Sequence, residues 1–270
     1  MTNLIGAALG MEDLPTYAHW LKDGQRDLEL QMFHSADVLE GDWRPLAQEV
    51  TRELDGYTGR LGIHGPFWGF SLASHDRDVR AIVAKRMDQA LDVCAVVGAT
   101  QIVIHSPYTT WDYNNLDLYK AARAGVIERV HQTLKAAVRR AEDQGVTFVI
   151  ENIEDVEPRD RLTLAQSFDS AAVRLSIDTG HAQYAHITNG APPVDYFVNS
   201  AGDMLHHIHL QDADGYADRH WALGEGNIRW QAVFRALEAL DSAPRLILEL
   251  RDKAGIPASM EYLASKALGR

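Results

Sequence analysis

The chain has 270 residues, of which 46% are hydrophobic and 24% are charged, so it holds enough apolar material for a globular core and differs from a disordered segment. Its 38 acidic and 26 basic residues give a net charge of −12 with neutral histidines, which argues against long nucleic acid as a partner. The longest apolar runs have the length of strands, so we expect neither a secretory signal nor a membrane span.

Eight apolar runs of strand length follow one another along the chain, at 4–9, 27–33, 60–64, 101–105, 146–151, 173–178, 205–210 and 245–250. Patterns with the period of a helix lie between them, and they predict helices over 77–97, 115–143 and 228–240. Gly98 and Gly145 follow the first two of these helices, where helix C-caps are expected.

This alternation of strands and helices predicts an α/β protein with a parallel sheet that is buried on both faces. Eight units in 270 residues fit a closed barrel better than an open doubly wound sheet, so we expect a single (β/α)8 TIM barrel over residues 1–270. No Gly-x-Gly-x-x-Gly follows the first strand and no Walker-type lysine loop is present, which gives a nucleotide-binding fold little support.

The chain contains one cysteine, Cys94, in an apolar helical segment. A single cysteine cannot form an internal disulfide, which is typical of a reducing compartment, so we expect a cytoplasmic protein. The sequence leaves the oligomeric state open, and a homo-oligomer is one alternative.

Polar residues gather where the predicted strands end. The last six strands end on, or run directly into, a His, Asp or Glu; these residues are His64, His105, Glu151, Asp178 with His181, His209 with the following Asp218 and His220, and Glu249. Because a barrel brings the carboxyl ends of its strands to one mouth, the nine side chains are expected to be neighbours. Four carboxylates close together without Lys or Arg repel one another, whereas imidazole nitrogen and carboxylate oxygen are ligands of zinc and manganese. The pattern therefore predicts a site for divalent metal ions.

The histidine-rich run 205–210 divides between the two faces of its strand. Alternation directs His206 away from His207 and His209. We expect His207, one pleat deeper than His209, to be a core residue or a support for the ligands. His34, which follows the second strand, is a further candidate for the mouth.

The same segments carry a family resemblance. "HGP" at 64–66, "HSP" at 105–107, "DTGHA" at 178–182, "HLQD" at 209–212 and "DRHxxLGEGNI" at 218–228 resemble motifs of the xylose-isomerase-like TIM-barrel superfamily. The resemblance spans essentially the whole chain, and the superfamily includes endonuclease IV and the sugar phosphate isomerases and epimerases.

In the endonuclease IV branch, the resemblance implies that the nine residues hold three zinc ions. Glu151 would bridge two ions, one of which Asp178, His209 and Glu249 would complete. The third ion would be held by His181, Asp218 and His220. This acidic chain departs from that branch because it shows no basic array for gripping DNA.

In the isomerase and epimerase branch, Glu151, Asp178, His209 and Glu249 would bind one ion, often manganese. The two glutamates would also transfer protons, and His181 would touch the substrate.

Two enzymatic reactions and one non-catalytic role are therefore compatible with the sequence. Metal-dependent hydrolysis of a phosphoester uses all nine ligands, and we favour it narrowly. Isomerisation or epimerisation of a sugar leaves Asp218 and His220 without a necessary role. A metal-dependent binding protein is the third alternative.

Four further residues are candidates for contacting a small sugar or phosphate ester. Trp68 and Trp111 are expected either to cover the substrate or to pack on the barrel rim. Arg219 and Arg251 are expected to bind a phosphate or to form ion pairs at the rim.

Overall fold

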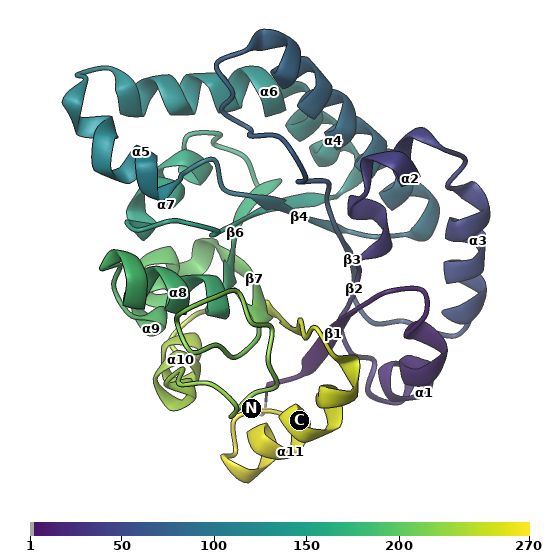
Figure 1. Ribbon diagram of the computed structural model, residues 1–270. Helices are drawn as coiled ribbons and strands as arrows, with labels where there is room; N and C mark the ends of the chain where they lie inside the picture. Colours follow the sequence, from purple (N-terminus) through teal and green to yellow (C-terminus); the bar gives the residue numbers. More distant parts are fainter. Residues whose placement is uncertain (1–2) are drawn as a thin grey trace.

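The computed structural model describes residues 3–270, and within them eight parallel strands form a closed barrel (Figure 1). The strands are β1 (Ile5–Leu9), β2 (Leu28–Leu30), β3 (Leu61–His64), β4 (Gln101–His105), β5 (Thr147–Glu151), β6 (Val173–Asp178), β7 (Leu205–Leu210) and β8 (Arg245–Leu248). Each strand pairs with the next along the chain, and β8 pairs with β1. The predicted (β/α)8 barrel is confirmed, and every observed strand lies within its predicted run.

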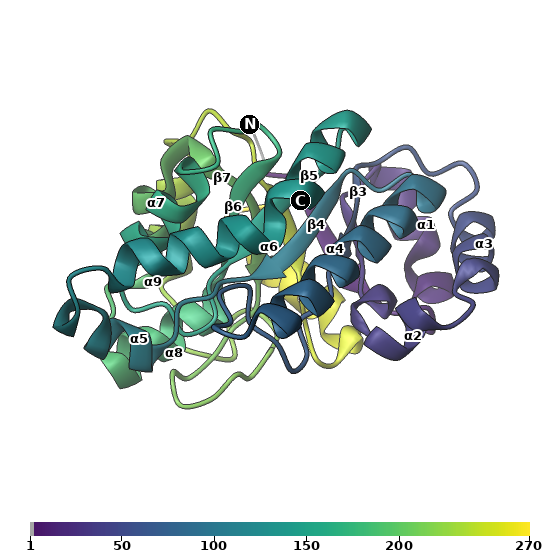
Figure 2. The same ribbon diagram turned by 90° about the horizontal axis from the view of Figure 1, so that it is seen from above.

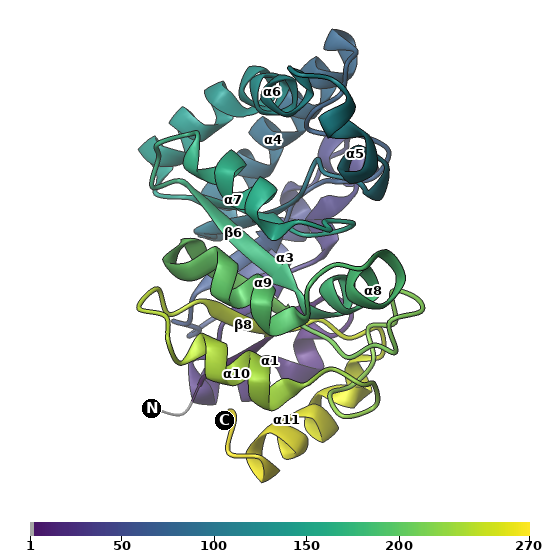
Figure 3. The ribbon, with the colours of Figure 1, turned by 90° about the vertical axis from the view of Figure 1, so that its left-hand side faces the viewer.

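Helices cover the outside of the barrel in all three views (Figures 1, 2 and 3). The α-helices are α1 (Leu14–Gly24), α2 (Ala36–Glu40), α3 (Arg44–Glu53), α4 (Arg77–Val97), α5 (Thr110–Asn115), α6 (Ala122–Gln144), α7 (Pro158–Gln166), α8 (Thr179–Asn189), α9 (Val194–Ala201), α10 (Trp230–Leu237) and α11 (Ile256–Ser265). Short 3-10 turns are η1 (Met32–His34), η2 (Leu116–Leu118), η3 (Gly202–Met204) and η4 (Lys253–Gly255). Gly98 and Gly145 adopt positive φ angles of 77° and 67°, as expected of helix C-caps.

One predicted helix is broken. The pattern over 115–143 predicts a continuous helix, but α6 begins at Ala122, and α5 and η2 precede it. Leu116 is buried within the break, so the apolar period continues although the backbone changes direction. The apolar period of a sequence indicates which side chains are buried. A turn that buries a residue at the right position keeps this period, so the pattern does not reveal that the helix is interrupted.

The inner face of the barrel is polar towards the carboxyl ends of the strands. In β7, His207 and His209 are buried while His206 is only partly buried on the opposite face, as alternation predicts. Segments that follow β1, β2, β3, β7 and β8 line the mouth to which the strands lead. None of the helices within residues 3–270 is long and apolar enough to cross a membrane.

Candidate metal centre

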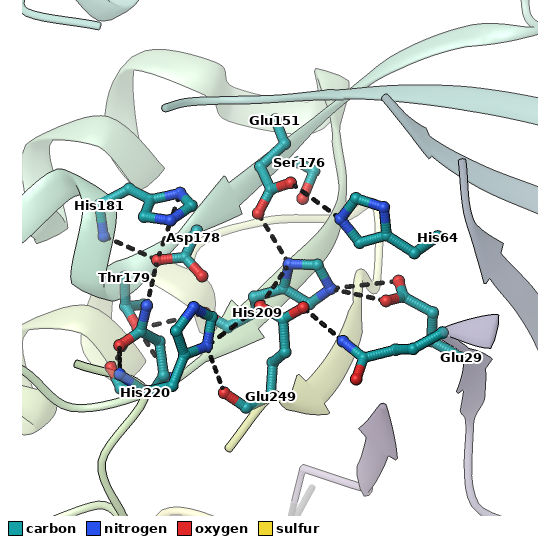
Figure 4. A network of polar contacts seen from close by, with 12 residues as sticks. Glu29, His64, Glu151, Ser176, Asp178, Thr179, His181, His209, His220 and Glu249 are labelled. Atoms are coloured by element: carbon teal, nitrogen blue, oxygen red, sulfur yellow. Dashed lines mark hydrogen bonds and ion pairs between the residues drawn. The ribbon is translucent and has the colours of Figure 1, made fainter. Parts of the chain in front are cut away.

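All nine predicted ligands meet at the mouth of the barrel, and several are seen together in Figure 4. They form three groups in which the potential ligand atoms lie within 4.8 Å of one another: His64, His105 and Glu151; Glu151, Asp178, His209 and Glu249; and His181, Asp218 and His220. Glu151 belongs to two groups. This division is the one that the resemblance to endonuclease IV implies.

The first group is centred on an oxygen that lacks a hydrogen bond. Glu151 Oε2 lies 3.7 Å from His64 Nε2 and 3.6 Å from His105 Nε2. It is buried and has no hydrogen-bond partner among residues 3–270. These separations are too long for hydrogen bonds, but they are close to the spacing of about 3–4 Å between two atoms that share one zinc ion. A cation therefore fits this group.

The second group places three acids around one imidazole. His209 Nδ1 lies 2.7 Å from Glu151 Oε1 and 3.3 Å from Glu249 Oε2. Asp178 Oδ2 is buried without a hydrogen-bond partner in the described part of the chain. Three buried carboxylates in one space are unfavourable without positive charge, which a divalent ion supplies.

The third group lies at the rim, where His181 of α8 meets Asp218 and His220 on the loop that follows β7. Asp218 Oδ1 is 3.4 Å from His181 Nε2 and 2.9 Å from His220 Nε2. Gln211 Nε2 donates to the same oxygen over 3.0 Å. His220 has a φ of 52°, the left-handed region that is uncommon for a residue with a side chain. The loop therefore keeps a strained backbone where His220 faces the other two ligands.

Protons on three imidazoles offset negative charge in the second and third groups when no metal is bound. Burial alone would lower the pKa of His220, but its hydrogen bond to Asp218 and the charge of Glu249 raise the pKa to about 9. Burial opposes protonation of His209 and His181 as well, yet the surrounding carboxylates raise the pKa of each ring well above its ordinary value. A bound cation would replace these protons.

The two glutamates differ in acidity. Burial tends to raise the pKa of Glu151, but the neighbouring His209 lowers it below the ordinary value. Burial raises the pKa of Glu249, and His209 and His220 only partly offset that effect. One carboxylate is therefore held ionised beside another that takes up a proton more readily.

Backbone carbonyls orient three of the ligand rings. The Nδ1 atoms of His64, His181 and His220 lie 2.9, 3.0 and 2.8 Å from the carbonyl oxygens of Gly65, Asn152 and Glu249. A carbonyl oxygen can only accept, so each Nδ1 donates and Nε2 is left to face its group.

Two further residues support the ligands through hydrogen bonds. Asn152 Nδ2 donates to the Asp178 carbonyl over 3.0 Å, and Asn152 Oδ1 accepts from the Asp178 amide over 2.9 Å. Asp212 accepts from the Gly224 amide at 2.8 Å and from Trp230 Nε1 at 2.9 Å. The first pair fixes the end of β6, and the second folds the loop that carries the third group.

A cavity of about 590 Å³ opens above the three groups. Of the predicted substrate residues, Trp68 and Arg251 line it, and Arg251 Nη2 also donates to the Asp218 carbonyl over 3.0 Å. The structure does not bring Trp111 or Arg219 to this cavity. Trp111 is 75% exposed on α5. Arg219 turns outward to Asp214, with an Nη2–Oδ2 distance of 2.8 Å.

Other cavity residues were not singled out by the sequence patterns. Phe67 stacks on His105 with ring centroids 4.2 Å apart, and Lys253 donates to the Leu250 carbonyl over 2.6 Å. His34, the further candidate from the second strand, also lines the cavity. The ligands could be identified from their positions near strand ends. Phe67 and Lys253 lie within loops and turns, and the sequence carries no comparable signal for the paths of these segments.

Glu29 was missed as well. It is 2% exposed in the middle of β2, between two leucines, and belongs to a further group with His207 and His209. The signal available in the sequence was a charged residue within an otherwise apolar strand.

Comparison with known proteins finds relatives of varied description. An uncharacterized protein of Methanocaldococcus jannaschii, MJ1311, is 27% identical over 192 residues, which cover 69% of this chain and 62% of that protein. The chain thus matches less than two thirds of that relative's length. A probable endonuclease 4 of Mycobacterium ulcerans is 27% identical over 210 residues, covering 74% of this chain and 77% of that protein.

Solved structures share the fold over nearly the whole chain. The TTHB071 protein of Thermus thermophilus, soaked with ZnCl2, has a TM-score of 0.74 and 26% identity, covering 97% of this chain and 96% of that chain. A D-tagatose 3-epimerase-like protein has the same TM-score and 21% identity, covering 98% of this chain and 96% of that chain. The family model described as xylose isomerase-like TIM barrel matches residues 24–266. This chain therefore belongs to the xylose isomerase-like TIM-barrel family.

Proposed function

We propose that this protein is a divalent-metal-dependent phosphoesterase that acts on a small substrate. The observation that carries the proposal is the third group, in which His181, Asp218 and His220 converge beside two other complete groups. A single-ion enzyme needs four ligands, and it would leave Asp218 and His220 of this group without a necessary role. The similarity to a probable endonuclease 4 and to a protein soaked with ZnCl2 also supports a metal-dependent phosphoesterase.

The nine residues would hold up to three ions, with zinc or manganese as the candidates. Bound divalent ions polarise phosphoryl oxygens and make a water molecule more acidic. Three ions carry a charge of +6 against the −4 of Glu151, Asp178, Asp218 and Glu249, so the loaded site attracts a phosphate despite the acidic exterior.

The chain itself would bind and orient the substrate. Arg251 and Lys253 line the cavity and add positive charge on the β8 side. Phe67 and Trp68, whose ring centroids are 4.8 Å apart, form an aromatic wall on the β3 side. A cavity of about 590 Å³ suits a sugar phosphate or another small ester.

A second candidate is a sugar isomerase or epimerase, which the two buried glutamates favour. Glu151 has a lowered pKa and Glu249 a raised one, and both contact His209. Two carboxylates whose pKa values are driven apart can serve as base and acid in proton transfer. His181 would then contact the sugar. Several solved structures of similar fold are described as epimerases, including the D-tagatose 3-epimerase-like protein.

Metal analysis combined with a substrate screen separates the two functions. The purified protein would be assayed by elemental analysis and tested on sugar phosphates, phosphodiesters and ketoses. About three ions per chain together with phosphoester hydrolysis would support the proposal. One ion together with ketose interconversion would support the second candidate instead.

Substitution of a third-group ligand gives a sharper test. We expect His220→Ala to retain the fold and to lose one ion per chain. Phosphoesterase turnover should fall by about 100-fold or more, because a bound ion stabilises transition-state charge by several kcal/mol. His19→Ala, at an exposed histidine on α1, is the matched control and should keep every ion. An unchanged metal content in His220→Ala would argue against the three-ion site.

A further inference from the structure

Glu29 lies directly behind His209, a fully buried ligand of the second group. Its two carboxylate oxygens are 3.0 and 3.1 Å from His209 Nε2. The other ring nitrogen, Nδ1, faces Glu151 at 2.7 Å and Glu249 at 3.3 Å. Figure 4 shows the His209 ring between Glu151 on one side and Glu29 on the other. His209 therefore uses one nitrogen for the metal group and the other for Glu29.

This orientation is the reverse of that seen for the three rings held by backbone carbonyls. His64, His181 and His220 direct Nδ1 to a carbonyl and Nε2 to their groups. His209 directs Nδ1 to its group and lacks a carbonyl contact on Nε2 within residues 3–270.

The position of His209 in the sheet explains the difference. It lies within β7, in register with Asp178 of β6 and Ile247 of β8, so the nearby carbonyls serve the ladders between strands. The His209 carbonyl itself accepts from Thr179 Oγ1 over 3.1 Å. An acceptor for a ring inside the barrel must therefore come from a side chain on another strand, and Glu29 of β2 provides it across the interior.

A second imidazole lies beside Glu29 at ion-pair distance. Glu29 Oε2 lies 3.2 Å from His207 Nε2, and His207 Nδ1 lies 2.8 Å from Ser176 Oγ. The serine hydroxyl can donate to Nδ1, which leaves the proton of His207 on Nε2, facing Glu29. Within residues 3–270, the ion-pair partners of Glu29 are His207 and His209.

We infer that Glu29 is a positioning residue for His209, and that it does for this ligand what backbone carbonyls do for the rings of His64, His181 and His220. Its carboxylate accepts the Nε2 proton, fixes the tautomer that leaves Nδ1 for the ion, and makes that nitrogen a better donor to a metal. The inference rests on the proposed function only in that a divalent ion is what His209 binds.

The first test is metal affinity. In Glu29→Gln, which keeps the shape but removes the charge, zinc affinity measured by competition with a chromophoric chelator should fall about 10- to 100-fold. Glu29→Leu, which removes the acceptor, should lose more. Asp27→Asn is the matched control, because Asp27 is also buried near β2 but pairs with Arg60, with an Nη2–Oδ2 distance of 2.6 Å. It should leave zinc affinity unchanged even if it lowers stability. Unchanged affinity in both Glu29 variants would overturn the inference.

The second test does not depend on metal or on activity. In the metal-free protein with ¹⁵N-labelled histidine, the Nε2 proton of His209 should give a downfield NMR signal because it is hydrogen-bonded to a carboxylate. Glu29→Leu should abolish or shift that signal, and Asp27→Asn should keep it. A signal that is the same in Glu29→Leu would overturn the inference. If the unsubstituted protein bound no divalent ion, the proposed function would fail while this spectrum still reported on the Glu29–His209 contact.

Discussion

At the scale of single residues, four of the five candidate histidine ligands are oriented by a contact to the ring nitrogen that faces away from the candidate metal group. Carbonyl oxygens of Gly65, Asn152 and Glu249 hold three of the rings, and these carbonyls lie in the backbone around the mouth. The rings are therefore oriented before an ion arrives. Preorganised ligands lose little side-chain freedom on binding, which favours tight association.

Zinc binding should be strongly dependent on pH. In the metal-free protein the raised pKa of His220, about 9, gives stability that is present below the unfolded value of about 6.5 and is lost as the pH rises through 9. The same proton competes with the ion. We therefore expect the apparent zinc affinity of the third group to rise at least about tenfold per pH unit between about pH 6.5 and 9.

Calorimetry in buffers of different ionisation enthalpy would measure the protons released. Binding of one ion to the third group should release at least one proton from the protein near pH 7.5. A zinc affinity that stays constant across this range, with no proton release, would contradict the raised pKa of His220.

At the scale of elements, the loop between β7 and α10 is folded around one buried carboxylate. Asp212 accepts from the Gly224 amide, the Ile228 amide and Trp230 Nε1. Gly224 has a φ of 97°, so a side chain there would be strained, and a Cβ would lie 2.7 Å from the Tyr262 ring. The loop therefore depends on a glycine and an internal acceptor to present the third group.

Removing this acceptor should loosen the third group first. Asp212→Ala leaves buried donors without partners, so we expect the free energy of unfolding to fall by about 2–5 kcal/mol. The metal-loaded protein should lose one ion more readily than the other two. Asp214→Ala, in the same loop, removes a solvent-screened pair with Arg219 and should change the free energy of unfolding far less than Asp212→Ala does. Equal effects of the two substitutions in chemical denaturation would contradict the role of Asp212.

A buried arginine links the two strands that carry Glu151 and Asp178. Arg161 of α7 donates to the carbonyls of Ile150 in β5 and Ser176 in β6 and pairs with Asp155, with an Nε–Oδ1 distance of 3.0 Å. Arg161 is 1% exposed and Asp155 is 2% exposed, so the pair lies away from water.

Loss of Arg161 should therefore be costly. Arg161→Ala leaves Asp155 as an unpaired buried charge, and we expect a destabilisation of about 3–5 kcal/mol in urea unfolding. Arg159→Ala, two residues earlier on the same helix, is the control. Its guanidinium is exposed and donates to the Tyr196 hydroxyl over 3.1 Å, so the change should be small. Comparable losses in the two variants would show that the buried pair is not the stabilising feature.

At the scale of the whole molecule, the net charge of the protein is negative, whereas a metal site loaded with three ions would be locally positive. The net charge is −12, whereas three ions would leave the nine-residue centre at about +2. With ions bound, a phosphate that is small enough to enter the cavity would meet the local positive charge. A long polyanion would also meet the acidic exterior, so we expect charge to favour small substrates.

Duplex DNA with an abasic site provides a direct test of this selection. We expect the zinc-loaded protein to show no saturable binding to a fluorescent duplex up to about 100 µM in near-physiological salt, because non-specific affinity depends on cationic contacts with phosphates. A salt-sensitive affinity in the micromolar range would contradict the prediction and would favour a nucleic-acid substrate.

The sequence by itself determined the strands, the barrel and the nine candidate ligands. Apolar runs of strand length are local features, and six of the nine ligands lie at or next to the end of a run, as with Glu151 after "FVI" and Glu249 after "LIL". Since a parallel barrel must bring those ends together, position along the chain was enough to predict proximity.

The tertiary structure alone decided what meets across the barrel and how the loops turn. Glu29 reaches His209 because closure of the sheet, in which β8 pairs with β1, brings β2 within reach of β7 across the interior, although the two residues are far apart in sequence. The positive φ of His220 and the outward path of Arg219 depend on packing of the loop, which no local period encodes. The period of apolar residues specifies on which face of a helix or strand a side chain lies. Which residue it meets across the barrel interior depends on how the strands close and on how far their register is shifted.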